Sequence, residues 1–380
     1  MEKEIRVLHV LQRMEAGGTQ ALLMNLYRNI EREKIQFDFL VEYPNKEFYD
    51  DEIISLGGKI YYSNIRQDKN VIEFERKLQK IIKENNYKII HVHTYSIGYF
   101  VLKTAKKCGV PIRIAHSHSN NMTNDFKKYF KIILQKLYPI YATNFIACSD
   151  EAGKYLFKNK KFEILNNAID SKKFIFSKET RCEIRKELGL SDKFVVGHVG
   201  RFKPEKNHLF LINIFFEIKK QLPDAKLLMI GNGDSSQEIT ERIRELSIQN
   251  DVIILKNRKD INKLYQAMDV FVFPSIYEGL GIVAIEAQAS GIPCVCSTGL
   301  PKESKITNLY TRLSLNESAK KWANVAIESS KNKLAFTNTQ KYVIKANYDI
   351  KMEAEKLENY YIDLYNEAIM RENYENNKNY

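Results

Sequence analysis

The feature that most constrains this chain is a regular alternation of two kinds of segment. Short runs rich in valine, isoleucine and phenylalanine, such as IRVLHV (5–10), FDFLV (37–41) and KIIHVH (88–93), are separated by longer segments whose apolar residues recur every three or four positions. The short runs have the composition of buried strands, and the longer segments have the spacing of amphipathic helices. Strands that alternate with helices predict parallel sheets covered by helices on both faces.

The alternation is interrupted once, which divides the chain in two. The polar and basic stretch at 166–181 contains no such run, and the pattern begins again with FVVGHVG and continues to PCVCS. We therefore predict an α/β protein with two doubly wound domains, at 1–170 and 171–350. Helical spacing over 350–370 predicts a last helix within the segment 351–380, with a frayed end after Arg371.

Composition narrows the cellular setting. The formal net charge is +12, but no nucleic-acid-binding motif accompanies the basic residues, which argues against nucleic acid as a partner. No apolar run is long enough for a signal peptide or a membrane span. Five cysteines, an odd number without metal-type spacing, fit a reducing cytoplasm.

A glycine pair follows the first predicted strand. Gly17 and Gly18 precede a helix that can begin near Thr19, a good N-cap residue. Glycines allow backbone N–H groups to approach a phosphate or a sugar closely, and a helix N-terminus adds partial positive charge. An ordinary turn between strand and helix explains the same residues, and both interpretations stay open.

Two cations follow the first strand of the second half. Arg201 and Lys206 lie in GRFKPEKN, where Gly200 and Pro204 shape the loop. A guanidinium and an ammonium that converge on one point suit a diphosphate, whose charge is spread over several oxygens. The alternative is two solvated surface cations.

Two glutamates flank the start of a predicted helix in YEGLGIVAIEAQAS (277–290). Glycines confine the helix to the stretch between Gly281 and Gly291, so Glu278 precedes it in a loop and Glu286 lies in its second turn. The first N–H groups of the helix are free to bind an anion. The candidate ligand-binding stretch comprises Gly279, Leu280, Gly281, Ile282 and Val283. Glu286 is set among apolar residues, so it holds either a ligand or a partner within its own domain.

These motifs occur in an order that resembles a known family. The glycine pair, the pattern G-R-x4-K and the pattern E-x7-E, on a two-domain α/β chain, resemble the retaining glycosyltransferases of family 4, which have the GT-B fold. The stretch VCSTGLPKESKITN is similar to bacterial members that assemble capsular polysaccharide or exopolysaccharide. The resemblance implies two Rossmann-like domains facing a central cleft, an N-terminal domain for the acceptor, a C-terminal domain for the nucleotide sugar, and a last helix that crosses back to the N-terminal domain.

The resemblance also implies a role for each motif. Arg201 and Lys206 would neutralise the diphosphate of the donor, Glu286 would accept hydrogen bonds from the ribose, and Glu278 would engage the sugar. The Gly17–Gly18 loop would close on the β-phosphate. Further donor-binding residues implied are Thr19, Gly231, Asn232 and Arg258, the last as a contact to the base. In the loop before Arg258, Lys256 and Asn257 stand where many relatives have glycine.

A histidine near the reacting centre is also implied, and PIRIAHSHSN offers two. His118 is the first choice because the strand is expected to end at His116. A neutral imidazole at this place could donate a hydrogen bond to the sugar or the phosphate. Histidines at strand ends also serve structural roles.

The implied reaction is transfer of a hexose-type sugar from a UDP-sugar to a lipid-linked saccharide, with retention at the anomeric carbon. The sequence contains no D-x-D motif, so we expect no metal and no cofactor apart from the nucleotide sugar as co-substrate. Three alternatives stay open: a glycosidase that uses the two glutamates, a non-catalytic partner that binds the nucleotide sugar, and a nucleotide-sugar epimerase.

Contact with a membrane is a further hypothesis. In FKKYFKIILQKLYPIYA an apolar stripe is flanked by Lys127, Lys128 and Lys131, so the predicted helix at 126–141 could lie on the anionic inner face of the cell membrane. A helix that packs the same stripe on the sheet is the alternative.

Overall fold

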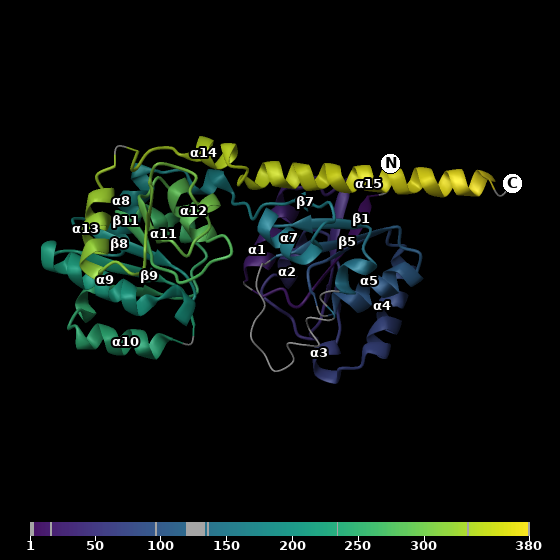
Figure 1. Cartoon of the computed structure of the whole chain (residues 1–380), viewed down its shortest axis with the longest axis horizontal. Helices are drawn as coiled ribbons and strands as arrows, with labels where there is room; N and C mark the ends of the chain where they lie inside the picture. Colours follow the sequence, from purple (N-terminus) through teal and green to yellow (C-terminus); the bar gives the residue numbers. More distant parts are fainter. Residues whose placement is uncertain are drawn as a thin grey trace. The chain divides into compact units, whose positions relative to one another are not determined.

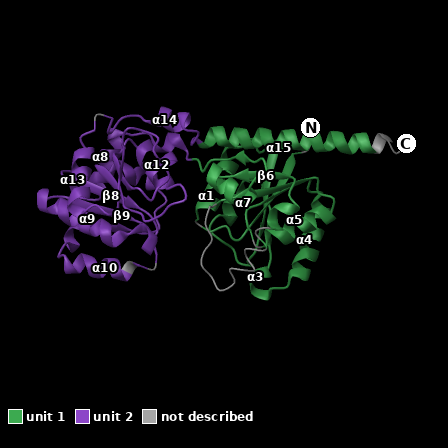
Figure 2. Ribbon diagram, viewed as in Figure 1, with its two compact units in different colours: residues 1–168, 350–380 green, residues 169–349 purple. Residues whose placement is uncertain are grey.

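The computed structural model describes residues 4–15, 17–95, 97–118, 134, 137–233, 235–332 and 334–378. The chain forms two compact units, the first of residues 1–168 with 350–380 and the second of residues 169–349 (Figure 2). Each unit is a parallel sheet with helices on both faces (Figure 1). The predicted α/β fold class with two doubly wound domains is therefore confirmed.

Unit 1 is built on a seven-stranded sheet in the order β3-β2-β1-β4-β5-β6-β7, and every neighbouring pair is parallel. The order reverses at β1 and β4, as in a doubly wound sheet. Its strands are β1 (Ile5–Leu11), β2 (Ile35–Val41), β3 (Ile60–Tyr62), β4 (Ile89–Val92), β5 (Ile112–Ser117), β6 (Asn144–Ala147) and β7 (Glu163–Ile164).

Alternate residues of these strands enter two separate cores. Val7 and Leu11 of β1 pack in one core, and Leu8 and Val10 pack in the other. The first core is completed by α1 (Gly18–Asn29), α2 (Asp50–Ser55) and α15 (Ile350–Lys378), and the second by α3 (Ile65–Asp68), α4 (Val71–Asn85), α5 (Gly98–Lys107) and α7 (Asp150–Phe157).

The long helix α15 returns the end of the chain to unit 1 (Figures 1 and 2). Its buried residues Ala354, Leu357 and Tyr361 pack with α1 and the sheet. Helix α15 continues past Arg371 to Lys378, and fraying of this end stays a prediction. An ion pair of 2.6 Å between Lys88 Nζ and Glu372 Oε1 ties the helix to unit 1 beyond that point.

Unit 2 repeats the design with a six-stranded parallel sheet in the order β10-β9-β8-β11-β12-β13. Its strands are β8 (Val195–Val199), β9 (Lys226–Ile230), β10 (Val252–Leu255), β11 (Val270–Phe273), β12 (Cys294–Ser297) and β13 (Tyr310–Leu313). One face is covered by α9 (His208–Gln221), α10 (Ser236–Glu245) and α13 (Ala319–Ser329), and the other by α8 (Lys178–Glu187), α11 (Ile261–Gln266), α12 (Ile282–Ala289) and α14 (Gln340–Lys345).

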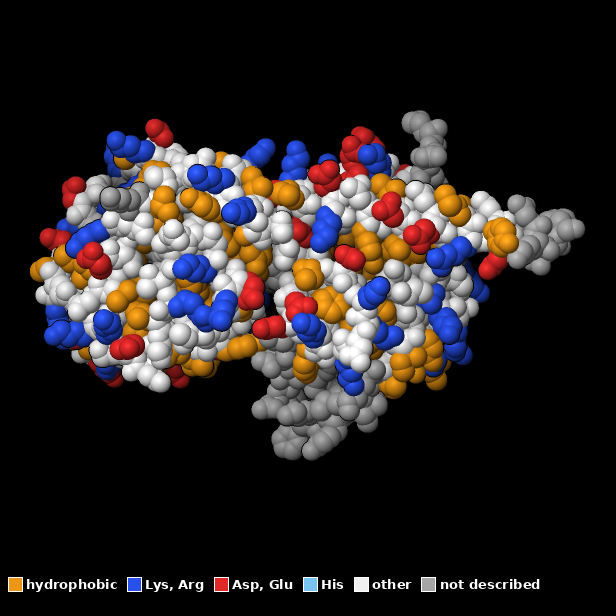
Figure 3. All heavy atoms as spheres, turned by 45° about the horizontal axis from the view of Figure 1, so that its top comes forward, with side chains coloured by type: hydrophobic (Ala, Val, Ile, Leu, Met, Phe, Trp, Pro, Cys, Tyr) orange, Lys and Arg blue, Asp and Glu red, His pale blue; other side chains and the backbone are white. Residues whose placement is uncertain are grey.

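The surface and the helices bear on the question of membrane contact. On the face drawn in Figure 3, lysines and arginines are interspersed with acidic residues over both units. No helix in the described part of the chain has both the length and the apolar content needed to cross a membrane. Of the predicted basic helix at 126–141, residues 126–133, 135 and 136, which include Lys127, Lys128 and Lys131, lie outside the described residues. Residues Tyr138–Ile140 form a short 3-10 helix, η1.

Candidate active site

Most of the predicted site residues in unit 2 lie at the carboxyl edge of its sheet. Arg201 follows β8, Gly231 follows β9, Arg258 follows β10, and Glu278 follows β11. In doubly wound sheets this edge is where ligands bind, because the loops there meet the N-termini of helices. The prediction that these motifs follow strands is confirmed by the element order.

Lys206 and Glu278, 72 residues apart in the sequence, form an ion pair at this edge. Lys206 Nζ lies 2.5 Å from Glu278 Oε1, and the two side chains are 19% and 10% exposed. The same carboxylate oxygen accepts a hydrogen bond of 2.7 Å from Ser275 Oγ. Lys206, predicted to bind the diphosphate, and Glu278, predicted to bind the sugar, thus lie in contact.

Backbone hydrogen bonds hold the two loops together. The carbonyl of Glu205 accepts a hydrogen bond from the amide of Ile276 at 2.8 Å, and the hydroxyl oxygen of Ser275 lies 2.9 Å from the same carbonyl. Glu205 belongs to the short helix η3 (Pro204–Lys206), which carries Lys206. The lysine and the glutamate are therefore positioned by backbone contacts as well as by their own ion pair.

Arg201 is exposed at the start of the same loop. Its backbone carbonyl accepts a hydrogen bond from Lys203. Among the described residues its guanidinium forms neither an ion pair nor a hydrogen bond, so its five donors remain available to a ligand.

Glycine at position 231 is required by the packing of the loops. A Cβ there would lie 1.9 Å from the carbonyl oxygen of Gly200, closer than any real contact. The neighbouring Asn232 donates to Asn257 Oδ1 at 2.6 Å. The hydrogen bond between Asn232 and Asn257 links the loop after β9 to the loop after β10.

Arg258 is engaged within its own loop. Its Nε and Nη2 donate to the two carboxylate oxygens of Asp260, at 2.7 and 2.6 Å. This bidentate pairing raises the pKa of Arg258 and fixes its guanidinium. Asn257 adopts a φ of +54°, in the left-handed region that glycine favours and asparagine tolerates, so it can replace the glycine of the relatives.

Helix α12 begins at a glycine with a left-handed backbone. Gly281 has a φ of +70°, and a Cβ at this position would also lie 2.9 Å from Leu300. Ile282 is the first helical residue, one residue beyond the predicted start. The first amides of the helix lack partners within it, while Gly279 and Leu280 form the loop that precedes them.

Glu286 has a partner within its own unit. Its Oε2 accepts a hydrogen bond of 2.9 Å from the hydroxyl of Tyr265 on α11, which also lies 3.0 Å from the carbonyl of Val283. Glu286 is only partly buried as a residue. Desolvation by the surrounding protein raises the pKa of its carboxyl group to about 7, although the hydrogen bond from Tyr265 acts to lower it. Glu286 thus has a partner within its own domain, as one alternative from the sequence requires. Because the residue is partly exposed, binding of a ligand, the other alternative, stays open.

The glycine pair belongs to unit 1. Gly17 is the N-cap residue of α1, with a φ of −124° that any residue can adopt, and α1 starts at Gly18, one residue before Thr19. A Cβ at Gly18 would meet nothing within 4 Å. The protein's own packing therefore does not require glycine at 18, which leaves open space beside the first amides of α1.

Five of the seven histidines gather on one face of the unit 1 sheet. His9 is in register with His91 across β1 and β4. The pairing of β4 with β5 ends at Val92 and Ala115, and the rings of the next residues, His93 and His116, have centroids 5.1 Å apart. Since residues two apart point to the same face, all of these side chains lie on the face that α1 and α15 cover. His118 continues this row just beyond the end of β5. We call His9, His91, His93, His116 and His118 the histidine cluster.

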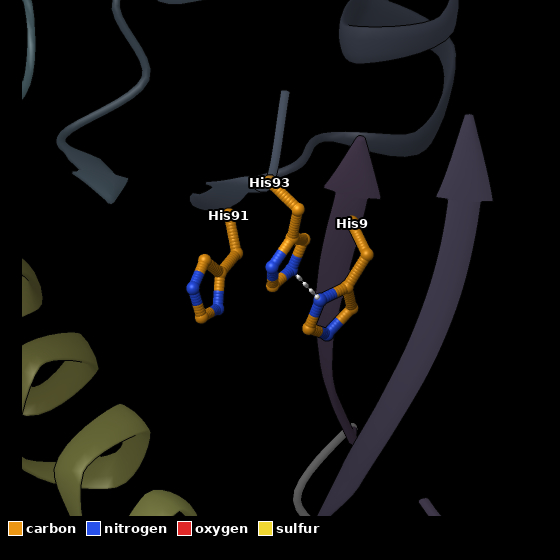
Figure 4. Close-up of side chains that lie close together, drawn as sticks. All are labelled: His9, His91 and His93. Atoms are coloured by element: carbon orange, nitrogen blue, oxygen red, sulfur yellow. Dashed lines mark hydrogen bonds between the residues drawn. The ribbon is translucent and has the colours of Figure 1, made fainter. Parts of the chain in front are cut away.

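The rings of the histidine cluster are linked by hydrogen bonds. His9 Nδ1 lies 3.0 Å from His93 Nε2, and His93 Nδ1 lies 2.8 Å from His118 Nε2 (Figure 4 draws the first contact). In a second row, His91 Nε2 lies 3.0 Å from His116 Nδ1, and His91 Nδ1 lies 2.6 Å from the hydroxyl of Tyr361.

Burial keeps these imidazoles neutral. It lowers the pKa of His9 to about 3 and that of His118 to about 4, and it places the pKa values of His91, His93 and His116 well below the usual range. The side chain of His116 is fully buried, whereas His118 is partly exposed. His118 is thus the one of the predicted pair that a ligand can reach.

The sequence analysis missed several members of the site. It did not identify Ser275, Tyr265, His9, His91 or His93. A signal for the last two was present, because H-V-H at 91–93 and H-S-H at 116–118 have the two-residue period that puts both side chains on one face of a strand. Tyr265 and Ser275 gave no comparable signal.

Comparison with known families covers both units. Residues 16–173 match the family described as Glycosyltransferase Family 4, and residues 180–349 match Glycosyl transferases group 1. EpsF of Bacillus subtilis (strain 168) is 36% identical over 329 residues, which are 84% of this chain and 86% of EpsF. The chain is a family 4 glycosyltransferase.

Two further relatives of this glycosyltransferase are described by their function. A UDP-Gal:alpha-D-GlcNAc-diphosphoundecaprenol alpha-1,3-galactosyltransferase of Escherichia coli is 25% identical, over 77% of this chain and 79% of the relative. The capsular polysaccharide biosynthesis glycosyltransferase CapH of Staphylococcus aureus is also 25% identical, over 94% of this chain and 99% of CapH.

Solved structures show the same architecture. HepE from Anabaena, in complex with UDP, superposes with a TM-score of 0.77 at 17% identity, over 94% of this chain and 100% of HepE. Its complex with UDP-glucose gives a TM-score of 0.76. The family 4 glycosyltransferase described here thus has the GT-B fold, as predicted.

Proposed function

We propose that this glycosyltransferase moves a hexose-type sugar from a UDP-sugar to a saccharide acceptor in the synthesis of a surface polysaccharide. The observation that carries the proposal is the contact of Lys206 with Glu278 at the carboxyl edge of the unit 2 sheet. It puts a cation for the diphosphate beside a carboxylate for the sugar, and these two groups are joined by one bond in a nucleotide sugar.

The two side chains keep capacity for a ligand while paired. An ammonium has three donors, and Glu278 uses one of those of Lys206. A carboxylate has two oxygens, and both Lys206 and Ser275 contact Oε1. The remaining donors of Lys206, together with exposed Arg201, suit phosphate oxygens, and Oε2 of Glu278 suits a sugar hydroxyl.

Glu286 is proposed to bind the ribose. Its hydrogen bond from Tyr265 occupies one oxygen, so the other can accept from a ribose hydroxyl. Such a bond favours the ionised carboxylate and would lower a pKa that the protein alone holds at about 7. In the proposed site, donor binding and ionisation of Glu286 therefore support each other.

The proposed reaction retains the anomeric configuration and needs no metal ion. The leaving nucleoside diphosphate gains negative charge in the transition state, and donors that are already in place stabilise it best. Arg201, Lys206 and the N-terminus of α12 supply such donors. The sugar is attacked on the face from which the diphosphate leaves, with no protein nucleophile.

His118 is proposed to donate a hydrogen bond to the donor sugar or phosphate. Its neutral ring has one N–H, and its partial exposure makes the ring accessible. The Gly17–Gly18 loop is proposed to offer amides to the same donor.

The proposed acceptor is a saccharide on a polyprenyl diphosphate, by analogy with the acceptor named for the Escherichia coli relative. Such an acceptor lies at a membrane, so we also propose that Lys127, Lys128 and Lys131 contact anionic lipid. Changing all three to glutamine should weaken sedimentation with vesicles of phosphatidylglycerol and leave UDP affinity unchanged. Undiminished sedimentation would refute the membrane contact alone.

The test of function is a transfer assay with purified enzyme, a panel of UDP-sugars and undecaprenyl-diphosphate-linked acceptors. We expect release of UDP and a glycosylated lipid whose new linkage has the anomeric configuration of the donor, with undiminished rate in excess EDTA. Isomerised nucleotide sugar without acceptor would indicate an epimerase instead. Activity lost with EDTA and restored by magnesium would overturn the assigned roles of Arg201 and Lys206.

A further inference from the structure

The histidine cluster contains five imidazoles, and the proposed hydrogen bond to the donor uses only that of His118. His93, His116 and His118 each offer one nitrogen within a set whose members lie within 4.8 Å of one another. Three ligands around a tetrahedral zinc ion, at about 2.0–2.1 Å each, lie roughly 3.4 Å apart. Small ring rotations would therefore bring these three nitrogens to the positions that one ion requires.

We propose that His93, His116 and His118 form a binding site for a divalent transition-metal ion such as Zn²⁺, and that occupation of this site inhibits glycosyl transfer. Neutral imidazole is a ligand that suits zinc, copper and nickel. The binding step does not depend on the proposed function, whereas the inhibition does.

The open ligand position is on His116. Its Nε2 is buried and has no hydrogen-bond partner among the described residues, while its Nδ1 contacts His91. When Nδ1 carries the proton and donates a hydrogen bond to His91, Nε2 has a lone pair that accepts no hydrogen bond. An ion would satisfy this buried nitrogen.

The hydrogen bonds around the cluster already supply an outer shell. A ligating histidine usually donates its other N–H to a neighbouring group, which fixes its tautomer and orientation. His116 has His91 as that neighbour, at 3.0 Å, and His93 has His9, also at 3.0 Å. His91 in turn contacts the hydroxyl of Tyr361.

An ion would take the place of the proton that His93 and His118 share. His93 Nδ1 and His118 Nε2 lie 2.8 Å apart, so they would separate by well under 1 Å to bind one ion. In the tautomers with His93 Nε2–H and His118 Nδ1–H, both contacting nitrogens have lone pairs, and no net proton is released.

The alternative group of His9, His91 and His93 also lies close together (Figure 4). His9 Nε2 has no hydrogen-bond partner among the described residues, like His116 Nε2. The group is still a poorer site, because both partners of His91, Tyr361 and His116, lie outside it, whereas the contact of His93 Nδ1 in the first group is with His118, a member of that group. His9 and His91 are also fully buried, whereas partly exposed His118 gives the first group a route for entry.

Occupation should inhibit transfer because it removes His118 from the substrate. An ion on Nε2 fixes the ring, and the open fourth position of the ion would hold water where the donor sugar is proposed to lie. Zn²⁺ should thus lower the rate, and EDTA should restore it.

The test uses the full chain without a histidine tag, stripped with EDTA and dialysed. Calorimetric titration with Zn²⁺ should show one tight equivalent, and Co²⁺ should give the visible absorption of a tetrahedral site. His116→Gln and His118→Gln should each lower Zn²⁺ affinity by at least about 100-fold, more than typical losses of outer-shell partners. His208→Gln, which removes a buried histidine of unit 2, should leave binding intact.

Each outcome decides the proposal. Because His118 lies beyond β5, His118→Gln keeps the test valid if His116→Gln fails to fold, as circular dichroism would show. Absence of a tight equivalent in the wild-type chain would mean that the cluster is a hydrogen-bond network only. Unchanged binding in His118→Gln together with loss in His9→Gln would assign the ion to the other group. If no transfer is detected with any donor, the proposed function fails, while the binding result stands.

Discussion

The carboxyl edge of the unit 2 sheet and the histidine cluster of unit 1 carry different kinds of polar side chain. In unit 2 the side chains at this edge are charged, as in the pairs Lys206–Glu278 and Arg258–Asp260. In the histidine cluster of unit 1 they are imidazoles that burial keeps neutral, among them His9 and His118. One fold thus supports a site suited to the charge of a diphosphate and a site suited to uncharged donors and lone pairs.

The difference follows from access to water. Lys206 and Glu278 retain some exposure to water and form an ion pair with each other. His9, His91 and His116 are fully buried without a carboxylate partner, and a protonated imidazole would be costly there. Charge therefore remains in unit 2 and is excluded from the cluster in unit 1.

The largest effect is expected from Lys206→Met, which tests the charged site directly. It removes the cation that we propose for the diphosphate and leaves Glu278 without its ion-pair partner. Loss of charged hydrogen bonds costs up to about 3 kcal/mol, so UDP affinity should fall roughly 150-fold. Isothermal titration calorimetry measures this change.

A matched control is Lys193→Met, which removes a surface lysine whose Nζ lies 3.0 Å from Asp224. It should leave UDP affinity unchanged, because the pair is exposed and removed from the carboxyl edge. A Lys206→Met enzyme that binds UDP as tightly as wild type would show that the charge of unit 2 is structural.

A smaller effect should divide the two glutamates of unit 2. Glu286→Gln should weaken binding of UDP and UDP-glucose alike, by about 1.5 kcal/mol or roughly 10-fold, because the amide oxygen can still accept one hydrogen bond. Glu278→Gln should not weaken UDP, since it frees Lys206 for the phosphates, yet it should lower affinity for UDP-glucose or the transfer rate. Four calorimetric affinities, with circular dichroism to confirm folding, decide the matter. Equal loss of UDP affinity in both variants would contradict the two roles.

The smallest effect concerns pH and distinguishes the units by their titration. The pKa of Glu286 is about 7 and binding favours its carboxylate, so affinity for UDP-glucose should increase from pH 6 to pH 8. The histidine cluster stays neutral over this range and should add nothing. Tyr265→Phe removes a hydrogen bond that lowers this pKa, so it should weaken binding at pH 7 by a few-fold, about 1 kcal/mol.

Stability should change with the opposite sign. The folded-state pKa of Glu286 lies above its unfolded value, so its contribution to stability is full below about pH 4.5 and is lost as pH rises through about 7. Glu286→Gln should therefore melt above wild type by a margin that grows toward pH 8, and its affinity for UDP-glucose should not vary over that range. A pH dependence that persists in Glu286→Gln would assign the titration to another group.

Much of the fold could be predicted because its signals are local. Strand runs, helical spacing and the glycines near 281 act within a few residues, so the two parallel α/β sheets and the start of α12 could be predicted. The contact of α15 with Lys88 could not be predicted, because Glu372 is 284 residues away in the sequence.

The sequence by itself determined which side chains stand at the carboxyl edges of the strands, since that depends only on where each strand ends. Tertiary structure alone decided which of them meet. Glu286 contacts Tyr265 because the tyrosine side chain reaches from α11 to α12, and Lys206 contacts Glu278 because the backbone of Glu205 binds the loop after β11. The histidine cluster depends on the register of β1, β4 and β5, which is set by pairing between distant segments. A shift of one residue in that register would move a strand's histidines to the other face.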